Sequence, residues 1–275
     1  MLCIVCQILV PPRPPHWLRE HSFRSPSLPP ISHRIPMPAQ PPVPPSACLP
    51  EPIPAPRGVC FDLDGLLVNT EELYQDVGTE LLRRRGKPFE PELLDRMMGR
   101  PQRVSLRIMI EWHALDDSVE TLAQETGEIF RSLLETRLKP MPGAVALIDS
   151  LTASAVPFGV ATSSGPDFAH DVLGRVGLLE RMGFVLTCDD VTEGKPHPEI
   201  YLAASGRLGV PPQRMLVLED SHNGCRAAVA AGAVAVAVPG GHSHRHDFPG
   251  AAFIAASLAD PRIYAALGLA AAESS

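Results

Sequence analysis

The sequence predicts an α/β fold, in which helices flank a parallel sheet and a helical domain is inserted after the first strand. From residue 58 onward, short apolar runs alternate with helical patterns, and each run ends in polar or glycine residues. Between the first and second runs, residues 69–139 have a helical pattern almost throughout. We therefore expect residues 57–68 and 140–275 to form the α/β core and residues 69–139 to form a helical cap.

Five apolar runs are the expected strands of this core. They span residues 59–61, 158–161, 184–187, 215–218 and 233–238. Helical patterns cover residues 168–176, 198–208 and 223–231. Strands that alternate with helices pair in parallel, so this order predicts a Rossmann-like sheet. In such sheets, ligands bind beyond the carboxyl ends of the strands.

The insertion is expected to contain four helices, at residues 72–85, 91–98, 104–112 and 119–138. Trp112 and Phe130 occur at helical spacing, so we expect both in the hydrophobic core of the insertion. The insertion as a whole should form a separate lid.

The first 56 residues differ in composition from the rest, because they contain more than half of the 31 prolines. Such a segment is predicted to be a disordered or polyproline II tail. It is a dispensable tail, an organelle transit peptide, or upstream sequence translated ahead of a natural start at Met37. A further alternative is a docking segment for an SH3 or WW domain, which would make the chain an adaptor.

Charge and composition narrow the class of partner. The formal net charge of −7 provides no basic surface, so we expect neither nucleic acid nor a membrane as a partner. No run approaches the roughly 20 consecutive apolar residues that a transmembrane helix requires. The six cysteines are scattered, which is typical of reduced thiols. We expect a cytoplasmic monomer that binds a small charged substrate.

Two acids, Asp62 and Asp64, follow the first run and precede Gly65. Because the strand ends there, both carboxylates can turn toward one site, and the glycine permits a sharp departure of the chain. Crowded acids at the end of a buried strand are costly unless a cation neutralises them, and Mg²⁺ prefers oxygen ligands. The pattern therefore indicates a Mg²⁺ site, with a plain turn or a calcium loop as the alternative.

Hydroxyl groups and a lysine follow the second and third runs. Thr162, Ser163 and Ser164 come between the second run and a helix, which is typical of a phosphate cradle or of an ordinary helix N-cap. Lys195 lies between a glycine and a proline that restrict its loop. A lysine held in this way can balance an anionic phosphoryl group, and an ordinary surface lysine is the alternative.

The fourth run is followed by two further acids, Glu219 and Asp220. Negative charge at a strand end again requires a cation or a partner, unless Asp220 only caps the following helix. All four segments occur in order, each after a strand of one predicted parallel sheet. Their side chains are therefore expected at the same edge of the sheet.

In this order the segments resemble the motifs of the haloacid dehalogenase (HAD) superfamily, at Asp62 to Gly65, Thr162, Lys195, and Glu219 with Asp220. The resemblance covers about residues 58–260, and the insertion is similar to the α-helical cap of that family. Local stretches look most like the phosphatases related to pseudouridine-5′-phosphatase and the sugar-phosphate phosphatases. β-Phosphoglucomutase is the close mutase relative.

The resemblance implies chemical roles for the acids. Asp62 would be the nucleophile that forms an aspartyl phosphate, and Asp64 would be the general acid and then the general base. Mg²⁺ would be held by the side chains of Asp62 and Asp220 and by the backbone carbonyl of Asp64. Glu219 would be a further or outer ligand of the metal.

The resemblance also implies residues that bind the substrate. Thr162, the amide of Ser163 and Lys195 would hold the phosphoryl oxygens. Ser164 and Arg100 would contribute to substrate specificity, with a solvated surface arginine as the alternative for Arg100. The substrate would be a small phosphorylated metabolite, such as a sugar or nucleoside phosphate, whose identity the sequence does not give.

Two positions depart from the pattern of relatives. Asn69 stands at the entry to the cap, where many relatives have aspartate, so a charge is missing there. Gln102 stands where the mutases have arginine, although Arg103 is next to it. The second departure favours hydrolysis. We therefore expect a Mg²⁺-dependent phosphatase, with a β-phosphoglucomutase-like sugar phosphomutase as the alternative.

Overall fold

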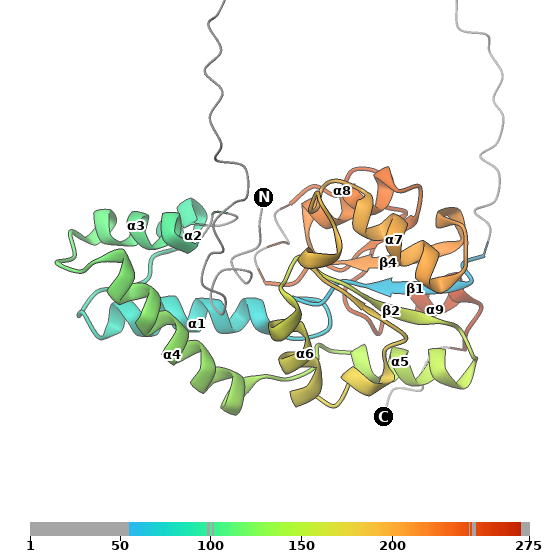
Figure 1. Ribbon diagram of the computed structural model, residues 1–275, viewed down its shortest axis with the longest axis horizontal. Coiled ribbons are helices and arrows are strands. Elements are labelled where there is room, and N and C mark those ends of the chain that lie inside the picture. The colour runs from blue at the N-terminus through green and yellow to red at the C-terminus, as the bar shows by residue number, and fades with distance from the viewer. Residues whose placement is uncertain (1–54, 98–99, 101, 242, 244–245, 271–275) are drawn as a thin grey trace, which may run out of the picture. The chain divides into compact units, whose positions relative to one another are not determined.

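A six-stranded parallel sheet organises the described residues (Figure 1). The computed structural model describes residues 55–270 except 98, 99, 101, 242, 244 and 245. Nearly all of the predicted proline-rich tail therefore lies outside the described residues, and its disorder stays a prediction. The strand order is β3-β2-β1-β4-β5-β6, and every neighbouring pair is parallel.

Five strands occupy the runs that the sequence predicted. They are β1 (Gly58–Phe61), β2 (Phe158–Ala161), β3 (Val185–Leu186), β4 (Met215–Glu219) and β5 (Val234–Ala237). The sixth strand, β6 (Phe253–Ile254), was not predicted, because its two residues lie among alanines, which are depleted in strands. The predicted α/β class with a parallel sheet is confirmed.

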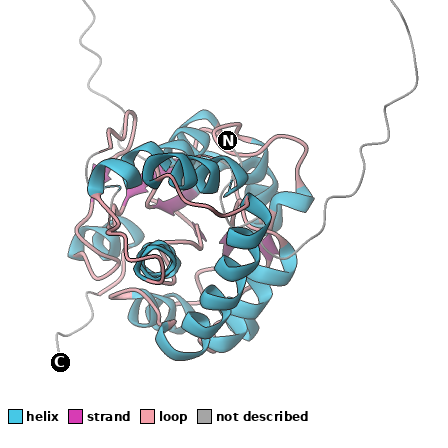
Figure 2. Cartoon of the chain, turned by 90° about the vertical axis from the view of Figure 1, so that its left-hand side faces the viewer, coloured by secondary structure: helices cyan, strands magenta, loops and turns pink. Residues whose placement is uncertain are grey.

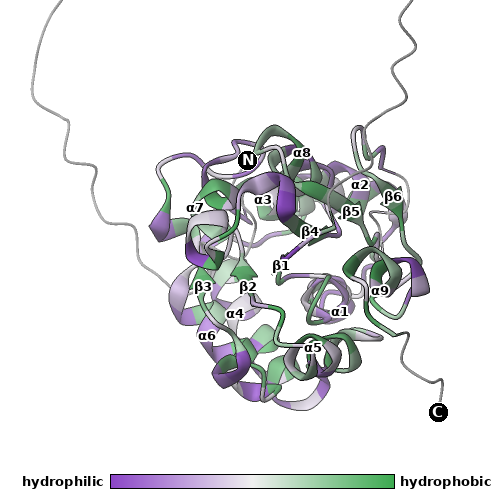
Figure 3. Cartoon of the chain, turned by 90° about the vertical axis from the view of Figure 1, so that its right-hand side faces the viewer, coloured by the Kyte–Doolittle hydropathy of each residue, from purple (hydrophilic) through white to green (hydrophobic). Residues whose placement is uncertain are grey.

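Helices cover both faces of this sheet (Figures 1 and 3). On one face lie α7 (Glu199–Leu208) and α8 (His222–Ala230), and on the other lie α5 (Ala144–Ala153) and α9 (Pro261–Leu267). After β2 comes α6 (Pro166–Arg175). The sequence predicted α6, α7 and α8 but missed α5 and α9. Short 3-10 helices lie at Leu179–Arg181, Cys188–Asp190 and Pro212–Arg214.

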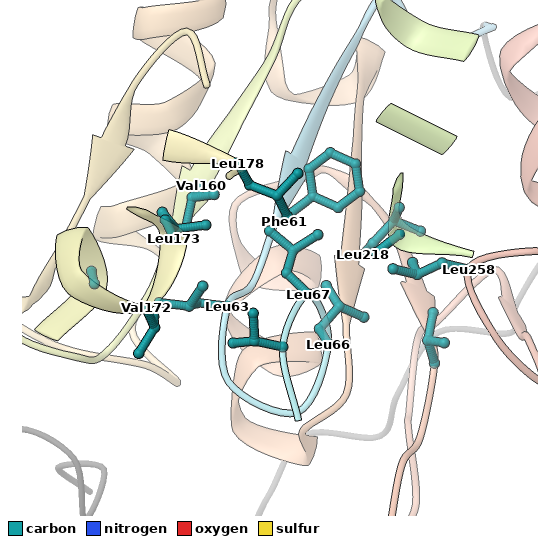
Figure 4. Close-up of a cluster of buried hydrophobic side chains, with 14 of the residues drawn as sticks. Phe61, Leu63, Leu66, Leu67, Val160, Val172, Leu173, Leu178, Leu218 and Leu258 are labelled. Atoms are coloured by element: carbon teal, nitrogen blue, oxygen red, sulfur yellow. The ribbon is translucent and has the colours of Figure 1, made fainter. Parts of the chain in front are cut away.

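Alternation along β1 divides its side chains between two hydrophobic clusters. Cys60 belongs to the cluster that includes residues of α7 and α8, whereas Phe61 belongs to the larger cluster on the opposite face. Figure 4 shows Leu63 and Leu67, from the loop after β1, in this larger cluster with Phe61. The buried Leu63 therefore anchors the short segment that carries Asp62 and Asp64.

The helical insertion lies between the segment that follows β1 and the segment that precedes α5. Its helices are drawn in cyan, like all helices, in Figure 2. Its helices are α1 (Thr70–Arg83), α2 (Pro91–Met97), α3 (Gln102–His113) and α4 (Val119–Arg137). All four occur where the sequence predicted helices. None of the described helices has both the length and the apolar composition that a membrane crossing requires.

The prediction for the aromatic residues of the insertion is confirmed for Phe130 and wrong for Trp112. The buried ring of Phe130 stacks on Tyr74 of α1 and on Phe168 of α6, with centroid distances of 4.4 Å and 5.9 Å. Trp112 is 37% exposed, because α3 turns Met109 and its neighbours inward instead. The guanidinium of Arg96 lies over the Trp112 ring, 4.9 Å from its centroid.

Asn69 joins the two chain segments that enter and leave the insertion. Its backbone N–H donates to the Lys139 carbonyl (3.2 Å), and its Oδ1 accepts from the Lys139 N–H (2.9 Å). Its Nδ2 donates to the Arg137 carbonyl and to Glu72, both at 3.2 Å. An ionised aspartate could not donate the last two bonds. The departure from the relatives therefore gives Asn69 a structural role as well as removing a charge.

Replacing Asn69 by alanine should destabilise the fold by about 1–3 kcal/mol, because the Lys139 N–H and the Arg137 carbonyl lose the partners that the buried Asn69 side chain provides. The control is Asn223→Ala in α8, a position with no side-chain hydrogen bond among the described residues. It should change the free energy of unfolding by less than about 0.5 kcal/mol. Urea denaturation measures both variants, and equal stabilities would contradict this role of Asn69.

Candidate active site

Charged side chains from separate parts of the chain meet at the carboxyl edge of the sheet. Strand β1 lies between β2 and β4, and Phe61 pairs with Leu218. The Asp62 N–H donates to the Leu218 carbonyl (3.0 Å), which extends this register by one residue. Asp62 therefore emerges beside Glu219 at the end of β4. The structure brings together the acids that the sequence put at strand ends.

The ammonium group of Lys195 lies at the centre of this site. Its side chain is 5% exposed, and Nζ donates to Asp62 Oδ1 (2.6 Å), Glu219 Oε1 (2.6 Å) and the Ala161 carbonyl (2.9 Å). Although burial lowers it, the charges of Asp62 and Glu219 raise the pKa of Lys195 above its ordinary value. Lys195 is therefore a charged, buried group that holds Asp62 in place.

Glu219 is completely buried, and each of its oxygens has two donors. Oε1 accepts from Lys195 and from the Tyr201 hydroxyl (2.6 Å), and Oε2 accepts from the Ser221 N–H (3.1 Å) and hydroxyl (2.9 Å). A Cβ atom on Gly224 would lie 1.7 Å from Oε1. The first turn of α8 can therefore approach this carboxylate only with glycine at that position.

Tyr201 and Gly224 were not expected at the site from the sequence. Tyr201 lies on the apolar face of α7, where an aromatic ring is usually part of the hydrophobic core. Only its hydroxyl group, which needs a hydrogen-bond partner when buried, could have indicated a role at the site. Glycine weakens a helix by about 0.5–1 kcal/mol relative to alanine, so a glycine inside a helix often has a packing reason. Gly224 in α8 was therefore the sign in the sequence that another group packs closely against this helix.

Three hydroxyl groups hold the carboxylate of Asp64. Its Oδ1 accepts from Thr70, the first residue of α1, at 2.8 Å. Its Oδ2 accepts from Ser164 (2.6 Å) and Thr162 (3.2 Å). Burial raises the pKa of Asp64, these hydrogen bonds oppose the shift, and the net direction is upward. Asp64 is therefore easier to protonate than an exposed aspartate.

Ser163 and Arg100 are the remaining residues that the sequence singled out. Ser163 is partly buried in the turn between Thr162 and Ser164. Arg100 is exposed on the insertion, where its Nε donates to the Arg96 carbonyl (2.7 Å). It lines a pocket at α2 and α3. Between described residues, no hydrogen bond or ion pair links Arg100 to the acids at the sheet edge.

Asp62, Glu219 and Asp220 form a buried acidic cluster, in which one oxygen of each lies within 4.8 Å of the others. Burial raises the pKa of Asp62 to about 8, with Lys195 opposing the shift. Burial likewise raises the pKa of Asp220 well above its ordinary value. Among the described residues, the buried Oδ2 of Asp220 has no hydrogen-bond donor. The cluster is therefore suited to hold a cation.

Comparison with known proteins identifies the family. Residues 59–238 match the family model described as haloacid dehalogenase-like hydrolase. The chain belongs to this family. The match spans β1 through β5 and includes the helical insertion, so the predicted membership of the HAD superfamily is confirmed.

HAD phosphatases are among the relatives of this chain. A phosphorylated carbohydrates phosphatase from Thermotoga maritima is 34% identical over 174 residues, which cover 63% of this chain and 81% of that protein. A Drosophila melanogaster protein named "Probable pseudouridine-5′-phosphatase" is 37% identical over 206 residues, which cover 73% of this chain and 89% of that protein.

A solved structure extends the similarity to three dimensions. It is the crystal structure of a HAD family hydrolase from Deinococcus radiodurans R1 with bound phosphate and sodium, and it is 29% identical in sequence. The TM-score is 0.66, and the match covers 79% of this chain and 99% of that one. The described core and insertion therefore have the architecture of a HAD hydrolase.

The substitution Gly224→Ala should destabilise the protein by about 3 kcal/mol, because the new methyl group overlaps Glu219 and displaces it from Lys195. The matched control is Gly206→Ala in α7, where a Cβ atom meets nothing within 4 Å. That variant should gain about 0.5–1 kcal/mol. Urea denaturation should therefore show opposite shifts, and a Gly224→Ala protein as stable as wild type would contradict this packing.

Proposed function

We propose that this HAD hydrolase is a Mg²⁺-dependent phosphatase of a small phosphate monoester, such as a sugar or nucleoside phosphate. The observation that carries the proposal is the environment of Asp62. Lys195 binds Oδ1, and no described residue donates a hydrogen bond to Oδ2. A buried carboxylate with one oxygen held and the other open is suited to attack phosphorus. The phosphatase names of the two relatives support the substrate class.

In the proposed mechanism, Asp62 attacks phosphorus and forms an aspartyl phosphate while the bond to the leaving oxygen breaks. Asp64 donates a proton to that oxygen and then accepts one from the water that hydrolyses the aspartyl phosphate. The raised pKa of Asp64 favours the protonated form that the first step requires. Thr162 and Ser164 would orient Asp64, so Ser164 acts through the acid as well as near the substrate.

Mg²⁺ would be held by the side chains of Asp62 and Asp220 and by the backbone carbonyl of Asp64. The fit rests on Asp220, whose buried Oδ2 has no donor among the described residues. Glu219 suits an outer position better than direct ligation, because four donors already occupy its oxygens. When bound, the ion would neutralise the acids and offset the charge of the phosphoryl group.

Substrate binding is proposed to involve both the sheet edge and the insertion. Thr162 and the backbone amide of Ser163 would hold the phosphoryl oxygens. Lys195, whose three N–H groups donate to Asp62, Glu219 and Ala161 in this structure, would turn one of them to the phosphoryl group. Arg100 would meet an anionic part of the substrate and thereby contribute to specificity. Residues 69–139 would act as a cap on the core formed by residues 57–68 and 140–275. We also propose that the protein is a monomer and that it is cytoplasmic.

The proposal is tested by incubating the protein with Mg²⁺ and a panel of sugar and nucleoside phosphates. Release of inorganic phosphate supports the phosphatase. Conversion to an isomeric sugar phosphate, with little release of phosphate, would show that the protein is a sugar phosphomutase and not a phosphatase. Gln102, at the position where the mutases have arginine, favours the first outcome.

The substitution Asp62→Asn should lower kcat by about three orders of magnitude or more, because an amide oxygen is a poor nucleophile. The change is nearly isosteric, so circular dichroism should show a folded protein. The control is Asp167→Asn, an exposed position in α6, which should keep wild-type turnover. Phosphate release measures both variants, and turnover near wild type in the Asp62 variant would refute the assignment of the nucleophile.

A further inference from the structure

A carboxylate from the insertion, Glu71, lies beside the acids of the sheet edge. Glu71 is in the first turn of α1, and Asp220 follows β4. Both lie against Gly65, where a Cβ atom would be 2.6 Å from Asp220 Oδ2 and 3.0 Å from Glu71 Cγ. Gly65 also has a φ of +77°, a backbone conformation that favours glycine. The two acidic side chains therefore approach each other over a residue that leaves them room.

Among the described residues, each of the two acids has one buried oxygen without a hydrogen-bond donor. Glu71 Oε2 and Asp220 Oδ2 are both buried, and neither accepts a hydrogen bond within the described part of the chain. After burial itself, the charge of Glu71 contributes most to raising the pKa of Asp220. Two buried anionic oxygens without donors are costly, and a nearby cation with its waters would satisfy both.

The geometry favours an indirect contact between Glu71 and the cation. Asp62, Glu219 and Asp220 are the described residues whose oxygens lie within 4.8 Å of one another, and Glu71 is outside this set. Mg²⁺ usually keeps several waters when proteins bind it. A carboxylate one water further out can accept hydrogen bonds from that hydration shell.

We propose that Glu71 binds the hydration shell of the divalent cation that Asp62 and Asp220 hold. This inference rests on the proposed Mg²⁺ site and adds to it a positioning residue from the insertion. Cation binding would then join the first turn of α1 to the edge of the sheet. Asp62 and Asp220 supply the direct ligands, and Glu71 strengthens the site from the side of the insertion.

Isothermal titration of the full chain with MgCl₂, without substrate, tests this role of Glu71. The variant Glu71→Gln should bind Mg²⁺ about 10–100-fold more weakly than wild type, as is typical when an outer partner of a metal site is lost. The matched control is Glu72→Gln at the next position of α1, where the exposed carboxylate accepts from Asn69 instead. Its Mg²⁺ affinity should stay within about twofold of wild type.

A second measurement separates this role from a general effect on folding. The metal-free Glu71→Gln protein should melt at or above the wild-type temperature, because no described residue donates a hydrogen bond to the buried Glu71 Oε2 and the substitution therefore breaks no such bond there. Added Mg²⁺ should raise the melting temperature of this variant less than that of wild type.

The outcomes distinguish failure of this inference from failure of the proposed function. If wild type binds Mg²⁺ and Glu71→Gln binds it equally well, the role of Glu71 is wrong and the phosphatase stands. If wild type binds no Mg²⁺, or if Asp220→Asn binds it as tightly as wild type, the proposed cation site itself is wrong. Weaker binding in the Glu71 variant with an unchanged Glu72 control supports the inference.

Discussion

The candidate active site depends on one buried ammonium group. Lys195 lies between Asp62 and Glu219 and offsets part of the cost of removing their carboxylates from water. The hydroxyl groups of Tyr201 and Ser221 hold Glu219, and Glu219 in turn keeps Lys195 against Asp62. One positive charge cannot balance three buried acids when one oxygen of each lies within 4.8 Å of the others. The excess of negative charge is the physical reason to expect a divalent cation there.

The insertion is connected to this site through its first residues. Asn69 joins the entering and leaving segments, and Thr70 donates to Asp64, the proposed proton donor. Glu71 lies beside Asp220 over the turn at Gly65. A movement of α1 would therefore change the surroundings of both the proposed proton donor and the proposed cation. In this chain, the orientation of the insertion and the electrostatics of the site are parts of one arrangement.

Strand ends were predictable, whereas the contacts that support them were not. Apolar runs followed by acids or hydroxyls located Asp62 and Glu219 at one sheet edge, because parallel strands end on the same side. The roles of Tyr201 and Gly224 depend on how α7 and α8 pack, which one sequence does not encode locally. Strand β6 was missed because its two residues lie among alanines, and Trp112 lies at the edge of the buried face of α3. The tail, the domain limits and the role of Arg100 stay predictions.

Asp62 and Asp220 are proposed to hold a divalent cation, while Lys195 binds Oδ1 of Asp62 and leaves Oδ2 open to phosphorus. A crystal structure of the protein grown with Mg²⁺ and beryllium fluoride, a mimic of the phosphoryl group, tests this arrangement most directly. We expect the beryllium bonded to Oδ2 of Asp62 and the cation between Asp62 and Asp220. Beryllium fluoride bound to another residue, or a cation remote from Asp220, would contradict the account.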